Sequence, residues 1–562
     1  MQTQLRPAVR RVPVRRVDLY PRQPRWPRAV EFGLFFAAAA LRFLYYGFRY
    51  FPQLDDYIQY DKYAQFAPLG EMIERLGLLS SRPIAGVADI AVWSHFWGAG
   101  MIAACLLLSA LWTASALLFR RVFDGEFGCG ALFCVLYLLL PFNFEGTYWI
   151  SASTRVVCGM FFAALALRLF SVWLTRGRWP WLVGFSAVQL ISFGFYEQTL
   201  ALSGAAVLGL MLLHLRRHPR RALGGLLTLV NLAIYFLFTL ANSGGPLAAR
   251  MSLILPWHEG YFSVFLPELF RQTGDAFAGG GVILARGFAR SLRILADDGR
   301  WWYLVLFAAL AGGIGLFCLT PAGANGRAVR RVSSSAAAVG FALLLVLAAL
   351  SPFFVVGNTW FSLRSAVPLT AGLALLGELA LRACFGRLAR TARRAAALTA
   401  CLLVLVCGVA SVSELHDYRR TYADDQRILA ALAEKLDGAE GRIGVLNLEK
   451  SYLPGQNFAF HEHIHGVSES NWAIQGALWA MTEQVPDVYP LAVADQPFYL
   501  AWNRELKRLG GFDSLWWWNH ETGELIPLTA EGSDAEGWTV FFPDGTPAGR
   551  VREENGVGYF SA

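Results

Sequence analysis

Charged residues are scarce in this chain of 562 residues. Asp, Glu, Lys and Arg make up 16% of it, whereas an ordinary soluble domain carries about 25%. Hydrophobic residues make up 55%, and the mean hydropathy is +0.41. This composition excludes an ordinary soluble protein. It predicts a polytopic α-helical membrane protein with room for one additional soluble domain.

Several motifs that would point to a known chemistry are also missing. The eight cysteines all precede residue 408, lie in or beside apolar stretches and have no CxxC spacing, so a disulfide framework or a zinc site is not expected. The sequence contains no Gly-x-x-x-x-Gly-Lys-[Ser/Thr] loop and no Gly-x-Ser-x-Gly elbow. A P-loop nucleotide site and a serine-hydrolase site are therefore excluded.

The charges that are present divide the chain into two unequal parts. Residues 1–413 hold 38 Lys and Arg against 18 Asp and Glu, whereas residues 414–562 hold 11 against 23. Basic residues of the first part lie mostly in short connections between apolar stretches, which indicates membrane topology rather than nucleic-acid binding. We expect a disordered basic cytoplasmic tail (1–28), a transmembrane domain (29–413) and an extracytoplasmic domain (414–562).

Apolar stretches long enough to cross about 30 Å of hydrocarbon recur through the transmembrane domain. They predict about eleven helices, at 29–49, 88–119, 127–143, 156–174, 181–196, 199–215, 222–240, 301–319, 334–356, 366–382 and 395–413. The first stretch has no small-residue cleavage site, so we expect it to be retained with a cytoplasmic N-terminus.

Arginine clusters in every second connection fix the predicted orientation. They are Arg120-Arg121, Arg176 with Arg178, Arg216 to Arg221, Arg327 to Arg331, and Arg382 to Arg394. The positive-inside rule places these connections in the cytoplasm. An N-terminus inside and eleven crossings then put the C-terminal domain outside, which agrees with the charge distribution.

The C-terminal domain and one long outer loop have patterns of their own. In the domain we expect α/β structure, with helices at 418–436 and 472–482, strands at 443–448 and 487–493, and a β-meander over 538–561. In the loop 241–300, Arg286, Arg290 and Arg293 recur at helical spacing, which predicts a basic stripe on an interfacial helix.

An aspartate pair, Asp55 and Asp56, follows the first apolar stretch on the predicted outer face. A carboxylate at the mouth of a membrane bundle is costly and is by default a functional candidate, here as general base for an acceptor hydroxyl. Adjacent residues cannot both point the same way on a helix, so one should face the cavity. The other aspartate could bind a metal, pair with an arginine or face solvent. The alternative to a functional role is that the pair merely begins a solvated loop.

Three arginines and a glutamate lie beside membrane ends on the same predicted face. Arg82, Arg155 and Arg364 run against the positive-inside bias, and a guanidinium there can bind a phosphate with two hydrogen bonds. Arg155 could instead snorkel to the interface. Glu197 lies in a very short connection and could pair with one of these arginines or take part in catalysis. Within the membrane, Arg42 is the exceptional charge, and we expect it to pair with a neighbour.

A histidine string in the C-terminal domain is the remaining candidate for a site. His461, His463 and His465 would share one face of a strand, and three imidazoles can bind zinc. No carboxylate that would orient them is evident, so a loop that faces a partner or the acceptor is favoured, and no metal ligand is assigned.

Together these features resemble a known group of membrane enzymes. The aspartate pair after the first helix, the Arg82-Pro83 that closes the loop, the Trp- and Ser-bearing second loop 148–155, the Tyr196-Glu197 pair and the late Arg364 are similar to bacterial GT-C superfamily glycosyltransferases, especially the O-antigen glucosyltransferase (Gtr-type) group. The resemblance covers roughly residues 29–413. The C-terminal domain matches no group.

The resemblance implies a GT-C-like transferase in the bacterial inner membrane that takes a sugar, of the hexosyl type, from a polyprenyl-phosphate donor. The acceptor would be an extracytoplasmic glycan or another envelope molecule. Asp55 or Asp56 would be the base of a single inverting displacement, with the phosphate held by Arg82, Arg155 or Arg364. Members differ over a divalent cation, so Mg²⁺ or Mn²⁺ stays open as a cofactor. Nucleic acid is not an expected partner.

Three other functions fit parts of the same pattern. A transporter or flippase of a lipid-linked glycan would need inverted repeats and mid-membrane charges, which are few here. An O-antigen polymerase or ligase also uses outer arginines and lipid carriers, but the early aspartate pair favours the transferase. A non-catalytic envelope assembly factor would work through its acidic outer domain and tolerate substitutions at the aspartates.

Overall fold

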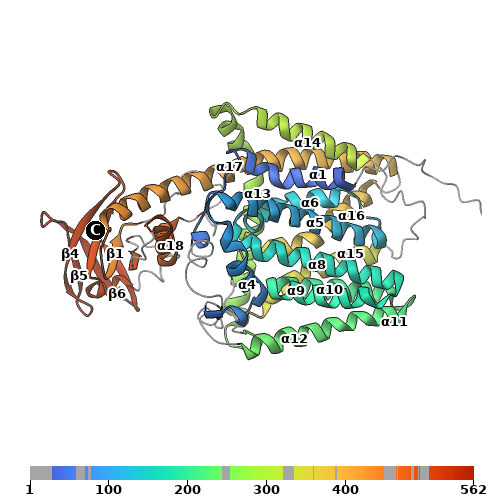
Figure 1. Ribbon diagram of the computed structural model, residues 1–562, viewed down its shortest axis with the longest axis horizontal. Coiled ribbons are helices and arrows are strands. Elements are labelled where there is room, and N and C mark those ends of the chain that lie inside the picture. Colours follow the sequence, from blue (N-terminus) through green and yellow to red (C-terminus); the bar gives the residue numbers. More distant parts are fainter. Residues whose placement is uncertain are drawn as a thin grey trace, which may run out of the picture.

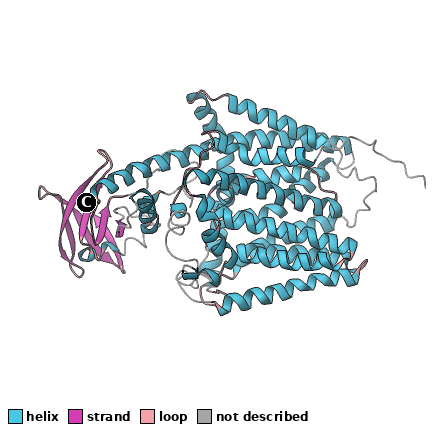
Figure 2. Cartoon of the chain, in the orientation of Figure 1, coloured by secondary structure: helices cyan, strands magenta, loops and turns pink. Residues whose placement is uncertain are grey.

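The computed structural model describes residues 28–57, 70–71, 73, 77–242, 253–319, 335–357, 360–385, 389–448, 464, 466–482, 487–491, 493 and 505–561. A helical bundle forms one part, and a strand-rich domain stands beyond one end of it (Figures 1 and 2). The predicted fold class, a helical membrane protein with a C-terminal α/β domain, is confirmed. Of the expected basic tail, only Arg28 lies within the described residues, where it starts α1 (Arg28–Ala40).

Eight helical segments in the described part of the chain are long and apolar enough to cross a membrane. Their main helices are α5 (Met101–Phe127), α8 (Ile150–Arg176), α10 (Glu197–Leu215), α12 (Leu227–Ala241), α14 (Trp302–Leu319), α15 (Ser335–Leu350), α16 (Thr370–Phe385) and α17 (Ala389–Lys435). Three of the eleven predicted spans are shorter as helices. They are α1, which continues into the 3₁₀ turn Leu41–Leu44, then α6 (Leu132–Leu139) and α9 (Trp179–Phe195).

Proline explains why the predicted span at 127–143 is not one helix. Pro141 disfavours the helical conformation of Leu140, whose ψ is 131°. The chain therefore continues as a 3₁₀ turn (Pro141–Asn143) and the short helix α7 (Phe144–Tyr148). The Asn143 side chain donates a 2.8 Å hydrogen bond to the Tyr137 carbonyl at the break. Polar backbone inside a bundle needs such a partner.

Two further predicted boundaries are wrong. The span expected at 88–119 is divided into α4 (Pro83–Ala91), two 3₁₀ turns and α5. The segment 148–155, expected as an outer loop, forms the end of α7 and the first turns of α8, and Trp149, Ser151 and Thr154 are buried in it. The polar residues of this segment suggested a solvent-exposed loop, but their side chains point into the interior of the bundle.

The arginine clusters that the structure describes and the C-terminal domain lie at opposite ends of the bundle (Figure 1). Helix α8 ends at Arg176, and α9 begins at the same end of the bundle. Helix α10 begins at Glu197, at the opposite end. Helix α17 starts at the arginine end, and its 47 residues are roughly 70 Å long, about twice the thickness of a bilayer core. It therefore leaves the bundle and carries the C-terminal domain on the same continuous helix.

Helix α13 (Leu266–Asp297) lies across the end of the bundle nearest the C-terminal domain (Figure 1). It forms within the predicted interfacial segment. Arg286 and Arg293 are exposed, but Arg290 turns inward and binds Asp417 of α17 through hydrogen bonds of 2.6 and 2.7 Å. The expected basic stripe is thus divided between an exposed surface and an anchor to α17.

The C-terminal domain is built on one sheet with the strand order β2-β1-β3-β4-β5-β6-β7. Its strands are β1 (Arg442–Leu446), β2 (Asp487–Leu491), β3 (Ser514–Asn519), β4 (Glu524–Ser533), β5 (Gly537–Phe541), β6 (Pro547–Glu554) and β7 (Val557–Ser561). Strand β1 runs parallel to β2 and β3, and the remaining pairs are antiparallel. The prediction found β1, β2 and the final meander but missed β3 and β4.

Alternation along β1 gives this sheet two covered faces. Ile443 and Val445 pack on one face with the end of α17 and with α18 (Asn471–Thr482), whereas Leu446 packs on the other face with Leu506 and Leu509. Side chains on a strand alternate between faces, so one short strand serves both cores.

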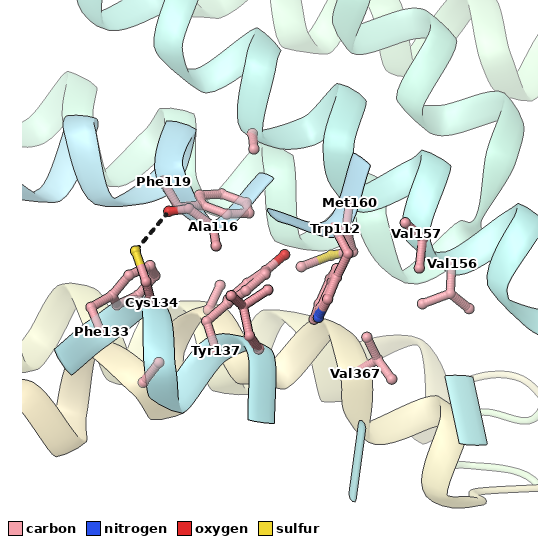
Figure 3. Close-up of a cluster of buried hydrophobic side chains, with 14 of the residues drawn as sticks. Trp112, Ala116, Phe119, Phe133, Cys134, Tyr137, Val156, Val157, Met160 and Val367 are labelled. Atoms are coloured by element: carbon pink, nitrogen blue, oxygen red, sulfur yellow. Dashed lines mark hydrogen bonds between the residues drawn. The ribbon is translucent and has the colours of Figure 1, made fainter. Parts of the chain in front are cut away.

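The bundle core at the level of α5, α6 and α8 is aromatic and closely packed (Figure 3). The rings of Trp112 and Tyr137 stack with centroids 4.2 Å apart, and the Tyr137 hydroxyl lies 2.9 Å from the Ser115 hydroxyl. These contacts fix α5 against the short helix α6 and so hold the broken segment that precedes α7.

Candidate active site

The aspartate pair begins a helical turn that directly follows a tight turn at Leu54, between the first helix and the C-terminal domain. Leu54 has a φ of 41°, a left-handed conformation that a leucine adopts only under constraint. The Asp56 amide donates a 2.9 Å hydrogen bond to the Gln53 carbonyl and closes the turn. The strained turn directs the two carboxylates to different surroundings.

Asp56 is fully buried, and each of its oxygens accepts two hydrogen bonds. The Ser151 amide and hydroxyl donate to Oδ1 at 3.0 and 2.6 Å, and the Gln53 amide and Tyr50 hydroxyl donate to Oδ2 at 3.0 and 2.6 Å. Burial raises the pKa of Asp56 to about 6, although these hydrogen bonds oppose the rise. Asp56 thereby caps the first turn of α8.

Asp55 is half-buried and faces the C-terminal domain. Its Oδ1 accepts a 2.9 Å hydrogen bond from the indole Nε1 of Trp472 on α18. Asp55 therefore has the more accessible carboxylate of the pair and the one placed between the two parts of the molecule.

Arg82 and Glu197 form an ion pair at the same end of the bundle. The Arg82 Nε donates to both Glu197 oxygens at 2.8 Å, and its guanidinium lies 4.8 Å from the centre of the Tyr196 ring. The pair joins the start of α4 to the start of α10.

Arg155 forms the second ion pair with a residue of α4. It donates to Asp89 Oδ2 at 3.0 and 3.1 Å, and the Thr154 hydroxyl donates to Oδ1 at 3.2 Å. Asp89 is buried, so this pair desolvates a carboxylate that Arg155 must neutralise. The pair holds α4 against α8 one helical turn beyond Ser151.

Trp149 joins the aspartate turn to Arg364. Its Nε1 donates a 3.4 Å hydrogen bond to the Gln53 carbonyl, and the Arg364 guanidinium lies 5.4 Å from its ring centre. Leu54 packs in the same hydrophobic cluster as Trp149. Arg364 and the turn that bears Asp55 therefore meet at one indole.

The structure thus gathers all six predicted site residues at one end of the bundle, in two kinds of setting. Asp56, Arg82, Arg155 and Glu197 form bonds that organise the bundle, whereas Asp55 and Arg364 meet the C-terminal domain and an aromatic face. The arrangement offers a carboxylate and several cations within one region of the surface near the bundle mouth.

Other residues of the site were not selected from the sequence. They are Tyr50, Asp89, Ser151 and Trp472, which bind the predicted residues. Ser151 had a usable signal, because it lies four residues before Arg155 and so shares its helix face. No sequence signal linked Trp472 to the site, since 417 residues separate it from Asp55.

The histidines at 461, 463 and 465, whose string also reads His-Glu-x-x-His, lie outside the described residues. Among the residues that the structure does describe, no three His, Cys, Asp or Glu side chains come together as ligands for a metal ion.

Comparison with known proteins gives a distant likeness to a solved structure. No protein-family model matches the chain, and no curated protein matches it. The crystal structure of ArnT from Cupriavidus metallidurans bound to undecaprenyl phosphate is similar, with 15% sequence identity over 84% of this chain and 86% of that one, at a TM-score of 0.34. Such a score lies below the range of a shared fold, and this likeness does not indicate the function of the chain.

Proposed function

We propose that this protein is an integral membrane glycosyltransferase of the GT-C type. It takes a sugar from a polyprenyl-phosphate donor and transfers it to a glycan or another envelope acceptor on the side of the C-terminal domain. The observation that carries the proposal is the junction at Trp149. This indole joins the turn of Asp55, a candidate base, to Arg364, a candidate phosphate ligand.

The orientation follows from the two ends of the bundle. Arginine clusters at one end favour the cytoplasm for that end, by the positive-inside rule. The site and the acidic C-terminal domain then face the outside of a bacterial inner membrane, where ATP is absent. Lipid-linked sugars are activated donors that can be used on that side.

Asp55 is the better general base of the two aspartates. One of its oxygens binds Trp472, and its half-buried side chain leaves room for an acceptor hydroxyl. Asp56 is a positioning residue, because all its hydrogen-bonding directions are taken by Ser151, Gln53 and Tyr50.

The reaction would be a single inverting displacement. The acceptor oxygen forms a bond to the anomeric carbon of the donor while the bond from that carbon to the phosphate oxygen breaks. The acceptor proton passes to Asp55, and the polyprenyl phosphate leaves with the bonding electron pair. The leaving group is already an anion, so cations contribute more to the barrier than a general acid would.

We assign that phosphate to Arg364, because its guanidinium lies at the same indole as the turn that bears Asp55. Arg82 and Arg155 already neutralise Glu197 and Asp89, and we expect them to hold α4 and the mouth of the site. The Arg364 guanidinium lies over the aromatic face of Trp149, and the planar edge of a guanidinium matches a phosphate in bidentate geometry.

A divalent cation fits this site only with help from the substrate. Mg²⁺ is commonly held by one or two carboxylates, substrate phosphates and water. Asp55 could supply one such ligand, whereas Asp56 has no oxygen to spare. A requirement for Mg²⁺ or Mn²⁺ is tested by measuring transferase activity after divalent cations are removed with a chelator.

Glycan mass analysis of a deletion strain tests the proposal. We expect a loss of one sugar from an envelope glycan, restored by the wild-type gene but not by Asp55→Asn. Asn keeps the oxygen that binds Trp472 and removes only the basicity, so the variant should accumulate normally in the membrane. Unchanged glycans in the deletion strain, or full restoration by a normally expressed Asp55→Asn protein, would contradict the proposed role.

A further inference from the structure

Arg42 lies within the membrane part of the bundle, in the 3₁₀ turn after α1. It follows the start of α1 by fourteen residues, which places it roughly 21 Å along the helix axis. It therefore lies in the half of the membrane nearer the C-terminal domain. A charge at that depth is expected to meet a counter-charge or a polar cavity.

Protein groups use only part of the hydrogen-bonding capacity of Arg42. Its Nη1 donates to the Thr147 hydroxyl at 3.1 Å, and its Nη2 donates to the Thr147 carbonyl at 2.7 Å. The Nε atom has no partner, and Arg42 forms no ion pair with any residue that the structure describes. A guanidinium carries five N–H donors, so most of them stay available.

Aromatic rings rather than acids surround the guanidinium. It lies 5.1, 5.2 and 5.7 Å from the ring centres of Phe43, Phe144 and Tyr148. Rings stabilise a cation through their π faces but do not neutralise it. The positive charge of Arg42 is therefore not compensated by the described protein around it.

Arg42 also lines a cavity in the bundle. This partly open groove has about 570 Å³ of unoccupied space, which includes space open to the outside. Its other walls are mostly apolar and come from α1, the break between α6 and α7, α13, α14 and α17. They include Ala38, Leu139, Pro141, Ile283, Phe307 and Ala410. The groove thus combines the Arg42 cation with an aliphatic surface.

We propose that this groove binds a lipid with a phosphate head group, with the phosphate on Arg42 and the first part of the tail against the apolar walls. A phosphate supplies the missing negative charge and accepts the unused N–H donors. A tail suits the walls, because they offer little to a hydrophilic ligand. Soluble anions would satisfy Arg42 but leave the apolar surface unused.

The site stands apart from Asp55 but connects to the aspartate turn. The Tyr148 ring lies 5.4 Å from the Tyr50 ring, and Tyr50 donates to Asp56. Two lipids share the required chemistry, a membrane phospholipid and a polyprenyl phosphate. Only the identification of the lipid as polyprenyl phosphate rests on the proposed transferase function.

Lipid binding to the purified, delipidated full-length protein tests the proposal. The probes are a long-chain polyprenyl phosphate, phosphatidic acid, and the uncharged polyprenol as a control for the tail alone. The variants are Arg42→Gln and Arg286→Gln. Arg286 is the matched control, because it is an exposed arginine of α13, two residues from the groove-lining Leu284.

We expect the wild-type protein and Arg286→Gln to bind at least one phosphate lipid equally well. Arg42→Gln should bind it about tenfold more weakly or worse, as is typical when a charge-assisted contact is lost. Preference for polyprenyl phosphate identifies a second site for this lipid, distinct from the donor phosphate position at Arg364, and equal binding of phosphatidic acid identifies a phospholipid site. Unchanged binding to Arg42→Gln, or polyprenol binding as tightly as its phosphate, overturns the proposal.

A measurement on the wild-type protein covers the case in which Arg42→Gln does not fold. A photoreactive polyprenyl phosphate should label peptides that contain residues 138–144 or 407–411, two segments from which most residues line the groove. Labelling confined to other segments overturns the proposal. Because binding and labelling do not depend on sugar transfer, they stay informative even if glycan analysis rejects the transferase.

Discussion

The indole of Trp472 donates a 2.9 Å hydrogen bond to the Asp55 carboxylate across 417 residues of sequence. It links the turn after the first helix to α18 of the C-terminal domain. Helix α18 packs on α17 and the sheet, so the position of the domain is transmitted to a candidate base. The C-terminal domain is therefore part of the site and not only an appendage to the bundle.

Replacing Trp472 by Phe should lower transferase activity several-fold while the protein still folds. The ring stays, but Asp55 loses the donor that orients its carboxylate. The measurement is the rate of sugar transfer by the purified protein. Trp538→Phe is the matched control, because that indole binds Asp534 at 3.0 Å in an exposed part of the same domain. Equal activity of both variants would show that the Trp472 bond does not serve catalysis.

Asp56→Asn should destabilise the fold, in contrast to Asp55→Asn. Whichever way the new side-chain amide turned, its NH₂ group would face a backbone N–H, from Ser151 or from Gln53. Leaving such buried donors unpaired costs about 2 kcal/mol of unfolding free energy. Thermal unfolding in detergent should show a lower Tm for Asp56→Asn and a nearly unchanged Tm for Asp55→Asn. A normal Tm for Asp56→Asn would contradict its role as the cap of α8.

Asp56 should also make stability depend on pH. Its pKa is raised to about 6 in the folded protein from an ordinary value of 3.8, so folding favours the protonated form. The stabilisation is full below pH 3.8 and is lost as the pH rises through about 6, in total about 3 kcal/mol. The difference in Tm between the wild type and Asp56→Asn, followed from about pH 4 to about pH 8, isolates this group. A difference that does not change with pH would contradict the raised pKa.

Asp89→Asn should loosen the mouth of the site by breaking its buried ion pair. The Asp89 side chain is 2% exposed and that of Arg155 is 26% exposed. Loss of a fully buried pair costs about 3 to 5 kcal/mol, and solvent at Arg155 reduces this to about 2 kcal/mol. Arg271→Gln, which breaks an exposed pair with Glu268, should cost well under about 1 kcal/mol. Equal Tm values for the two variants would show that Asp89 is not needed to fix α4.

Hydropathy placed most of the helical segments correctly, because each must cover a similar thickness of hydrocarbon. It failed where local chemistry interrupts a helix, as at Pro141, and where polar residues turn inward, as at Ser151. In the C-terminal domain, β3 was missed because its three consecutive tryptophans alternate between the two cores, so the strand shows no alternation of apolar and polar residues.

The sequence by itself determined the class of the protein, the arginine-rich end of the bundle and the choice of charged residues worth testing. These features depend on composition and on spacing along one helix. Only the tertiary structure decided which charges neutralise one another, that Asp56 caps α8 while Asp55 meets Trp472, and that Arg42 has no acid beside it among the described residues. Those outcomes depend on contacts between segments far apart in the chain, and hydrogen bonds and desolvation act at distances that only folding sets.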